Sequence, residues 1–517
     1  MRRRSFVVTF SASPLVLSGC TVGPDYRRVP PANPPPPDYK EASGPGTGTA
    51  ADFRPALPRD AIDRGPWWTI YGDPPLDGLE RQIDISNQTL KQAEAAYRQA
   101  RALVRQDTSA LYPSISATGS AQQTGTGGLR GGGVARSDST VGQFNTGTAL
   151  AWEIDLWGRI RRQIESDSAA AQASAADLAS ARLSAQADLA TNYFSLRISD
   201  QRIQLYQATV AAYARSVEIA QNQVDAGIVS RVDLVQAQTQ LEQTRAQLVA
   251  EGITRAQFEH AIAVLIGKAP ANFSLEPGPL PRETPTVEAG VPSALLERRP
   301  DIASAERAMA SANAQIGVAQ AAYYPSISLG ASFNVLSSGL GNLLQLGNAV
   351  WAVGPQLAAT LIDGGALKAQ VEGARANYDA QVATYRQSIL LAFQQVEDAL
   401  VQQRILVQQE QIQRAAVAAA REAERLSLKQ YRIGTVPFTT VVQTQTAALS
   451  AEQSLLTVRL NRFLASANLV KALGGGWRVS DLPAATPIGG IDQRPQPSPQ
   501  PGVPATIPAP RQWWKLW

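Results

Sequence analysis

The chain has very little cysteine and histidine. Its 517 residues hold one cysteine, Cys20, and one histidine, His260. A single thiol excludes disulfides within the chain, and a single imidazole excludes a zinc site built from two histidines. No GxSxG elbow or phosphate-binding glycine loop occurs, and the plentiful acidic residues do not group into a catalytic pair. We therefore expect no enzyme, no cofactor and no metal site, and we interpret His260 as structural.

Two long stretches contain no proline. The chain has 34 prolines, but residues 114–269 and 356–436 have none. Because proline interrupts helices, such stretches can hold very long ones. After residue 19 no run of 18 apolar residues occurs, so no transmembrane helix is predicted. Any membrane crossing must then use strands, because only helices and closed barrels satisfy their backbone groups in lipid.

The chain also lacks a strong excess of charge. Its formal charge of +4 includes three arginines at positions 2–4, and falls to about +1 without them. No basic patch is interleaved with aromatic residues, so no nucleic-acid partner is expected.

The N-terminus has the layout of a bacterial secretory signal. The three arginines precede an apolar run, residues 6–17, and the sequence Leu-Ser-Gly-Cys follows and ends at Cys20. We expect residues 1–19 to be a signal peptide and Cys20 to receive a lipid that tethers the protein to a membrane. The alternative is an ordinary signal peptide with a chance cysteine. Residues 20–75 are rich in proline and are expected to form an extended, lipidated leader.

The chain repeats itself. Residues 112–116 return as 324–328, and residues 226–238 parallel 433–445, which lie 207 positions later. Further matches at the same offset of 207 are Gly158 with Gly365, Gln163 with Gln370, Glu165 with Glu372, and Gly267 with Gly474. One ungapped offset over a long span indicates duplication. We expect a first repeat over 76–267, a linker over 268–300, a second repeat over 301–474 and a proline-rich tail over 475–517.

Each repeat is expected to begin with one helix and two strands. The helices are predicted over 76–110 and 301–322, and Asp301 can cap the second one. The strands are predicted over 111–124, 141–156, 324–337 and 349–363. Apolar and small polar residues alternate strictly along the third strand, with Ile327, Leu329, Ala331, Phe333 and Val335 on one face. Such alternation is typical of a transmembrane barrel wall and also of a soluble sandwich; the long Gly-rich loops favour the barrel.

Two very long helices follow the strands in each repeat. They are predicted over 159–226 and 231–266, and again over 365–433 and 438–473. The first carries apolar residues at steps of seven and a second seam beside them: Leu196, Ile203, Val210, Val217 and Val224, then Ser199, Tyr206, Tyr213 and Ala220. These heptads indicate coiled coils. A soluble bundle is the alternative, but its helices rarely exceed 25 residues.

Four strands are too few to enclose a pore. Two copies of the chain would give eight strands and a filled barrel, whereas three would give 12 and an open lumen. The fold class expected is therefore all-α combined with a transmembrane β-barrel, in which each chain adds four strands to a shared 12-stranded trimeric barrel.

The sequence is similar to the outer-membrane factor family, the TolC/OprM-type exit ducts of tripartite efflux pumps, and to their lipoprotein branch. The matching segments are 20–26 (CTVGPDY), 67–73 (WWTIYGD), 297–302 (ERRPDI), 319–329 (AQAAYYPSISL) and 471–477 (KALGGGW). The resemblance implies an outer-membrane homotrimer with a periplasmic α-barrel. It also implies docking to a membrane-fusion adaptor and to an inner-membrane pump, usually of the RND class, and passive export of drugs, toxic compounds or metals. Thr21, after the lipidated cysteine, is consistent with delivery to the outer membrane. A periplasmic coiled-coil scaffold or adaptor lipoprotein is the alternative function.

The resemblance also assigns the ends of the long helices. It places the closed periplasmic end and the adaptor-docking tips at Gly227, Ile228, Val229 and Ser230, and at Gly434, Thr435, Val436 and Pro437. Asp233 and Tyr431 occupy positions that form a closing hydrogen bond in the family, although two solvated polar residues near a turn remain the alternative. Gln443, with Gln236 in the first repeat, stands where relatives often carry an acidic ring, so the constriction is expected to be less acidic.

Overall fold

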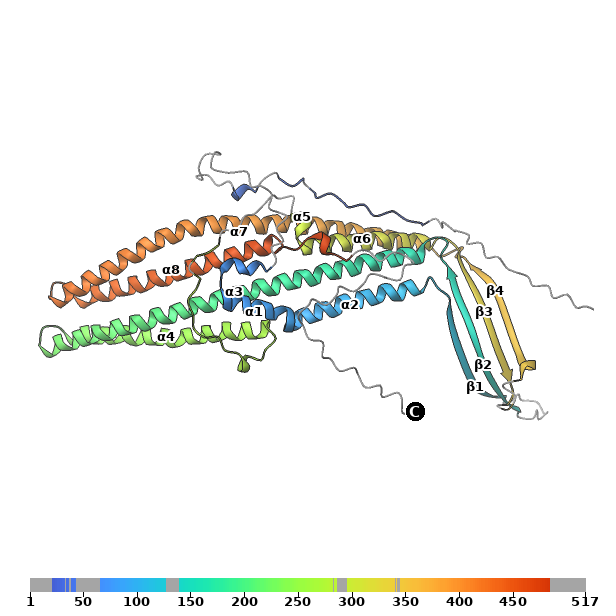
Figure 1. The fold of residues 1–517 in the computed structure, drawn as a ribbon, viewed down its shortest axis with the longest axis horizontal. Helices are drawn as coiled ribbons and strands as arrows, with labels where there is room; N and C mark the ends of the chain where they lie inside the picture. Colours follow the sequence, from blue (N-terminus) through green and yellow to red (C-terminus); the bar gives the residue numbers. More distant parts are fainter. Residues whose placement is uncertain are drawn as a thin grey trace, which may run out of the picture.

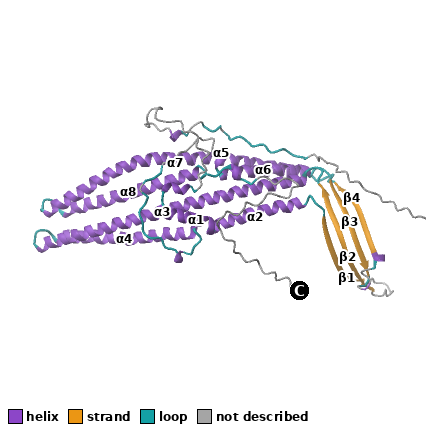
Figure 2. Cartoon of the chain, in the orientation of Figure 1, coloured by secondary structure: helices purple, strands orange, loops and turns teal. Residues whose placement is uncertain are grey.

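The molecule is elongated, with helices at one end and strands at the other. The computed structural model describes residues 21–32, 34–36, 39–42, 66–126, 139–281, 283–285, 295–339, 341 and 345–483. The expected signal peptide, Cys20 and the tail beyond residue 483 lie outside the described residues. Two helical hairpins run side by side away from a single sheet (Figure 1). Figure 2 shows the α-helices separate from the strands, with one short 3-10 helix, η7 (Leu346–Asn348), at the far end of the sheet.

Two hairpins of equal size form most of the length. The first pairs α3 (Arg159–Asp225) with α4 (Arg231–Leu265), and the second pairs α7 (Ala366–Arg432) with α8 (Phe438–Ala472). The long helices have 67 residues each and the return helices 35. At 1.5 Å per residue, each long helix spans about 100 Å. No described helix combines the length and the apolar character needed to cross a bilayer.

The two heptad seams of α3 are buried unequally. Ser199, Tyr206, Tyr213 and Ala220 are buried, because this seam faces other helices of the same chain. In the all-aliphatic stripe Leu196 is buried, whereas the residues at positions 203, 210, 217 and 224 are only half-buried. From the sequence pattern alone, the aliphatic stripe would be expected to be the more buried of the two.

The four strands form one antiparallel sheet in chain order. They are β1 (Ser114–Thr126), β2 (Ser139–Ile154), β3 (Ser326–Ser337) and β4 (Ala349–Ala358). The register aligns apolar residues across all four strands, as in the row Ile115, Leu150, Ala331 and Val353. The neighbouring row on the other face holds small residues, Ser116, Ala149, Ser332 and Ala352. In the described part of the chain, the outer edges of β1 and β4 have no partner strand.

The expectation of one helix over 76–110 is wrong. The structure has α1 (Pro74–Ser86) and α2 (Gln88–Ser109), which Asn87 separates. Asn87 is extended, and its side chain accepts a hydrogen bond from the Leu90 amide at 3.0 Å while donating to the Leu265 carbonyl at 2.7 Å. One asparagine thus caps a helix and ties it to α4, which a helical pattern cannot reveal.

The cap assigned to Asp301 is also wrong. The helix there, α6 (Pro300–Ala321), begins at Pro300, and Arg299 holds the cap position without a side-chain hydrogen bond. Proline at the first helical position needs no amide partner. Asp301, inside the first turn, binds the Arg299 guanidinium at 2.6 Å and accepts a hydrogen bond from the Ile302 amide at 3.0 Å. The last expected strand, predicted to residue 363, ends at Ala358, and α7 starts at Ala366.

Three apolar clusters hold the chain together. The largest lies around a short 3-10 helix, η3 (Trp67–Tyr71), where Tyr71, Phe194 and Phe463 pack with ring centroids 4.8–6.1 Å apart. A second cluster joins both hairpins near their tips, and a third joins the leader to α6 and α7. The core is therefore a series of local clusters along an elongated frame.

A buried ion network fastens the linker to the first hairpin. Asp200 on α3 binds Arg255 on α4 at 2.7 Å and accepts a hydrogen bond from the Gly278 amide at 3.0 Å. Arg197 donates to the Glu276 carbonyl at 2.7 Å. A Cβ at Gly278 would lie 2.7 Å from this guanidinium, so a larger residue there would have to displace the Arg197 side chain. Residues 276 and 278 of the linker therefore cross the first hairpin near the middle of α3.

Candidate functional site

The two hairpins end in the same turn. After α3, Gly227 adopts φ +70°, and the amides of Gly227 and Ile228 donate to carbonyls of the last helical turn at 2.9 and 2.8 Å. After α7, Gly434 adopts φ +75°, and the amides of Gly434 and Thr435 donate at 2.9 and 3.0 Å. This left-handed glycine ends a helix by satisfying its free carbonyls. The sequence similarity between residues 226–238 and 433–445 therefore begins with the same helix-ending motif in both repeats.

The return helices start differently. The Ser230 side chain caps α4 by accepting from the Val232 amide at 3.2 Å, whereas Pro437 occupies the cap of α8 without such a bond. Ile228 at one tip and Ile433 just before the other are about two-thirds exposed, at 65% and 68%. Val229 and Val436 are partly buried against the cluster that joins the hairpins. Both tips thus present apolar surface while their bases are fixed to each other.

The structure brings Asp233 and Tyr431 together. Asp233 is in the first turn of α4, and Tyr431 is in the last turn of α7, so each comes from a different hairpin. The Tyr431 hydroxyl donates to an Asp233 carboxylate oxygen at 3.5 Å, a long hydrogen bond. Tyr431 is 1% exposed and packs edge-on against Phe438 at 5.0 Å. Burial, followed by the Asp233 charge, raises the pKa of Tyr431 to about 12, so the phenol is neutral and can donate.

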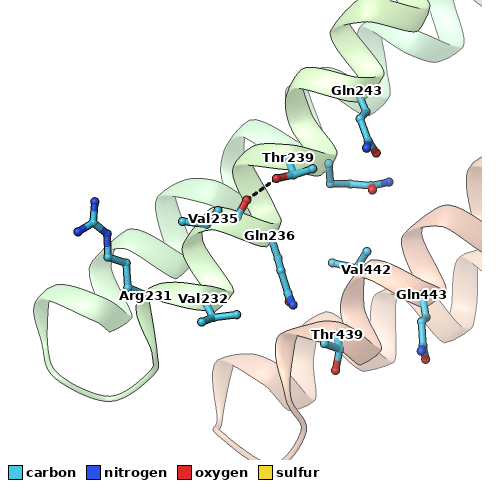
Figure 3. A pocket seen from close by; sticks show the side chains of 10 residues that line it. Arg231, Val232, Val235, Gln236, Thr239, Gln243, Thr439, Val442 and Gln443 are labelled. Carbon is cyan, nitrogen blue, oxygen red and sulfur yellow. Dashed lines mark hydrogen bonds between the residues drawn. The ribbon is translucent and has the colours of Figure 1, made fainter.

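Gln236 and Gln443 line one groove between α4 and α8 (Figure 3). The groove has a volume of about 720 Å³, and Val232, Val235 and Val442 contribute its apolar part. Of the ten residues that line it, Arg231 alone is charged. The Gln236 Oε1 atom is buried and has no hydrogen-bond partner among the described residues. The two glutamines thus share a groove without acidic residues.

Sequence reasoning missed most of this groove. Gln240 and Gln243 extend the Gln236 stripe along α4, and Gln240 donates to Thr446 of α8 at 3.2 Å. Thr439 lies one turn before Gln443 on α8 and faces the same space. The helical spacing of 236, 240 and 243 was a usable signal, because residues three and four apart share a helix face.

The leader is fastened where the helices meet the strands. Cys20 itself lies outside the described residues, but Thr21 and Val22 follow it directly. The Val22 amide donates to the Trp157 carbonyl at 3.0 Å, and Arg162 of α3 donates to the Val22 and Gly23 carbonyls at 3.2 Å. Gly23 has φ +106°, and a Cβ there would lie 2.4 Å from the Gly317 Cα. Two of the first described residues of the leader, Val22 and Gly23, are therefore held at the helix–strand junction.

Within the described ranges, no group of three or more His, Cys, Asp or Glu residues could hold a metal ion. His260 is exposed on α4.

Comparison with known proteins identifies relatives over nearly the whole chain. Residues 80–268 and 291–475 match the family described as outer membrane efflux protein. The chain is 31% identical to the probable efflux pump outer membrane protein TtgC of Pseudomonas putida, over 91% of this chain and 96% of that protein. It is 28% identical to the cation efflux system protein CusC of Escherichia coli, over 90% and 97%. The solved outer-membrane channel OprN superposes with a TM-score of 0.76 at 30% identity, covering 89% of this chain and all of that one.

Proposed function

Because the chain belongs to the outer membrane efflux protein family, we propose that its two hairpin tips form the periplasmic gate and docking surface of an outer-membrane exit duct. The protein is an outer-membrane efflux channel that extends into the periplasm and exports small molecules passively. It is a homotrimer that works with a membrane-fusion adaptor and an inner-membrane RND pump. Three copies of the four-stranded sheet pair their free edges and close a 12-stranded barrel.

The gate proposal rests on the contact between Asp233 and Tyr431. The two residues come from different hairpins, so separating the hairpins must break their hydrogen bond. A long hydrogen bond contributes only about 0.5–1.5 kcal/mol, which suits a latch that a docking adaptor can open. The exposed isoleucines at the tips, Ile228 and Ile433, supply the apolar surface for an adaptor. The acid-free groove around Gln236 and Gln443 supports a constriction without strong cation preference.

Single-channel conductance in a planar bilayer tests this gate. We expect Asp233→Ala and Tyr431→Phe to raise the open fraction of the purified trimer about two- to tenfold, the equivalent of the hydrogen bond that each removes. Tyr206→Phe is the matched control, because Tyr206 accepts a 3.0 Å hydrogen bond from Gln453 far from the tips. If the gate variants conduct like this control, Asp233 and Tyr431 are not the latch.

The membrane anchor is a second part of the proposal. A signal peptide over residues 1–19, lipidation of Cys20 and a leader over 20–75 are supported by the contacts that hold Thr21 to Gly23 at the helix–strand junction. Acyl chains on Cys20 would enter the bilayer beside the barrel without further ordering of the chain. Intact-mass measurement of the mature protein tests this: a Cys20→Ala variant should lose the mass of the acyl groups.

We also propose that the chain catalyses no reaction. Relatives in the family are channels, and the sequence has neither a nucleophile motif nor paired histidines. A scaffold lipoprotein, the alternative hypothesis, would need neither an amphipathic four-stranded sheet nor its free edges. Dependence of the purified protein on detergent separates a channel from such a scaffold.

A further inference from the structure

A cavity of about 470 Å³ lies beside the leader at the helix–strand junction. Val22 of the leader and Tyr323 and Tyr324, which follow α6, form one side of it. Lys368, Glu372 and Arg375, from the first turns of α7, form the other side. The cavity therefore combines two aromatic residues and three charged ones at a point where three separate segments of the chain meet.

Arg375 occupies a position that is apolar elsewhere on α7. The helix packs against α6 and the leader through a heptad stripe that includes Tyr378, Val382, Tyr385 and Ile389. Arg375 continues this stripe, seven residues before Val382, but its side chain is exposed. An apolar residue would extend the seam at this position. The guanidinium instead lines the cavity.

The charges of the cavity are not balanced. Lys368 and Glu372 form an exposed ion pair at 3.8 Å, with side chains 78% and 65% exposed. Such a pair is weak and is easily rearranged around a third charge. Arg375 has no hydrogen bond or ion pair within the described part of the chain. The three charged residues of the cavity thus carry a net charge of +1. Lys368 can leave its weak pair with Glu372 and turn toward a bound anion.

The aromatic side of the cavity is rigid and half-exposed. Tyr323 and Tyr324 are 51% and 45% exposed. Trp157 stacks on Tyr324 at 4.9 Å, and its indole nitrogen donates to the Pro325 carbonyl at 2.7 Å. Tyrosine and tryptophan gather at the water–lipid interface of membrane proteins, where the ring is in contact with lipid and the hydroxyl with headgroups.

The position of the cavity places it at a leaflet surface. Val22 is two residues from Cys20, whose lipidation belongs to the proposed function on which this inference rests. The strands that cross the outer membrane start within a few residues of the two tyrosines, because β3 begins at Ser326. The cavity therefore lies at the headgroup level of the periplasmic leaflet.

We propose that this cavity binds the headgroup of a phospholipid from the periplasmic leaflet, with the phosphate between Arg375 and Lys368. A guanidinium matches the geometry of a phosphate, and the lysine adds a second charge. The two tyrosines lie where the glycerol backbone meets water, and the acyl chains extend along the barrel. The bound lipid would lie next to the acyl chains of Cys20 and fill the groove between the leader and α7.

Native mass spectrometry of the full-length trimer, titrated with palmitoyl-oleoyl-phosphatidylglycerol in detergent, tests this site. A basic residue near an anionic lipid surface contributes about 1 kcal/mol, so Arg375→Gln should weaken lipid binding about fivefold. Arg375→Lys keeps the charge and should stay within about twofold of the unmodified protein. Arg98→Gln, at an exposed arginine of α2 remote from the cavity, is the matched control and should have no effect.

A second ligand separates phosphate recognition from simple uptake of acyl chains. Dioleoylglycerol has acyl chains but no phosphate, so it should not occupy the site. Equal binding of the two lipids, or Arg375→Gln behaving like Arg98→Gln, would overturn the proposal. The same spectra report the mass of the acyl groups on Cys20. Failure of the lipid site on a fully acylated trimer therefore leaves the anchor and the channel intact.

Discussion

The two helical hairpins have the same lengths but not the same surroundings. In α3, 27 residues are buried, against 10 in the equally long α7. The first helix packs against α1, α2, α4, α6 and α8, whereas the second packs against α6, α8 and the leader. The equal lengths of α3 and α7 therefore follow from the duplication, whereas their different burial follows from the number of helices that pack against each. In a homotrimer, the open sides of α7 are surfaces that another subunit can cover.

An arginine at the equivalent position of each hairpin binds different partners. Arg255 on α4 and Arg462 on α8 are 207 positions apart, the offset between the repeats. Arg255 binds the buried Asp200 on α3, which also holds the linker. Arg462 binds Glu410 on α7, which additionally binds Arg414 and Arg459. The first network also includes main-chain groups of the linker, whereas the second consists of Glu410 and three arginine side chains that are partly exposed to water.

The largest expected effect comes from the glycines that end the return helices. Gly267 and Gly474 are equivalent, with φ +69° and +87°, and a Cβ would lie 2.2 Å from the Ser86 carbonyl oxygen and 1.9 Å from that of Arg298. We expect Gly267→Ala and Gly474→Ala each to cost about 4 kcal/mol or more, because backbone must move. The yield and thermal stability of the purified trimer measure this loss.

The tip glycines provide the control for that comparison. Gly227 and Gly434 also have positive φ, but nothing lies within 4 Å of an added Cβ. Their alanine variants should lose only about 1–2 kcal/mol, the cost of left-handed backbone. Similar losses at all four positions would mean that φ alone, and not close packing, dictates glycine here.

The ion networks should differ when their acids are neutralised. We expect Asp200→Asn to cost about 3 kcal/mol, because it leaves the buried Arg197 without a counter-charge and leaves Arg255 with Glu259 as its only acidic partner among the described residues. Glu410→Gln should cost about 1 kcal/mol, because water screens its more exposed arginine partners. Thermal unfolding near neutral pH compares the two variants. A larger loss for Glu410→Gln would contradict the contrast between the networks.

A buried glutamate in α1 predicts that the stability of the fold depends on pH. Glu80 is fully buried, and neither carboxylate oxygen has a partner among the described residues. Burial, with Asp84 and Asp77 nearby, raises its pKa to about 9. The folded state therefore keeps a proton that the unfolded state releases above its ordinary pKa near 4.5, so this contribution to stability falls as pH rises from about 4.5 to 9. The slope is on the order of 1 kcal/mol per pH unit.

Glu80→Gln isolates that contribution, because glutamine is neutral at every pH. Thermal unfolding between pH 5 and 9, roughly the window set by these pKa values, should show a flatter pH dependence for this variant than for the unmodified protein. Parallel curves would mean that Glu80 ionises in the folded state without cost.

The smallest expected effect concerns the two glutamines of the tip groove. Gln443 is exposed, whereas Gln236 is half-buried with a shielded oxygen. Gln443→Glu should therefore stay charged and increase cation preference, measured as the reversal potential across a salt gradient. Gln236→Glu should shift it less, because burial disfavours its carboxylate. Both shifts should correspond to less than about 1 kcal/mol and shrink at high salt. Equal shifts would show that both hairpins face the pore alike.

Much of the fold could be predicted because its signals are local. Heptads and missing prolines predicted the long helices, and period-two alternation predicted the strands. The break at Asn87 was not predicted, because a single polar residue between two amphipathic helices is typical of an exposed position. Only the structure shows that its side-chain amide donates to the Leu265 carbonyl. The tip glycines stood out because helix ends need left-handed backbone. The wider groove did not, since glutamine and threonine are common on any exposed helix face.

By itself, the sequence determined the duplication, the lengths of the four long helices and the two faces of the sheet, because each is a periodic or local property. The family resemblance had paired Asp233 with Tyr431, but only the tertiary structure shows these residues, 198 positions apart, in contact. Only the tertiary structure likewise shows that the leader crosses at Gly317. It also decided which heptad seam is buried. Contacts between distant segments depend on how several helices pack at once, and no single segment records that geometry.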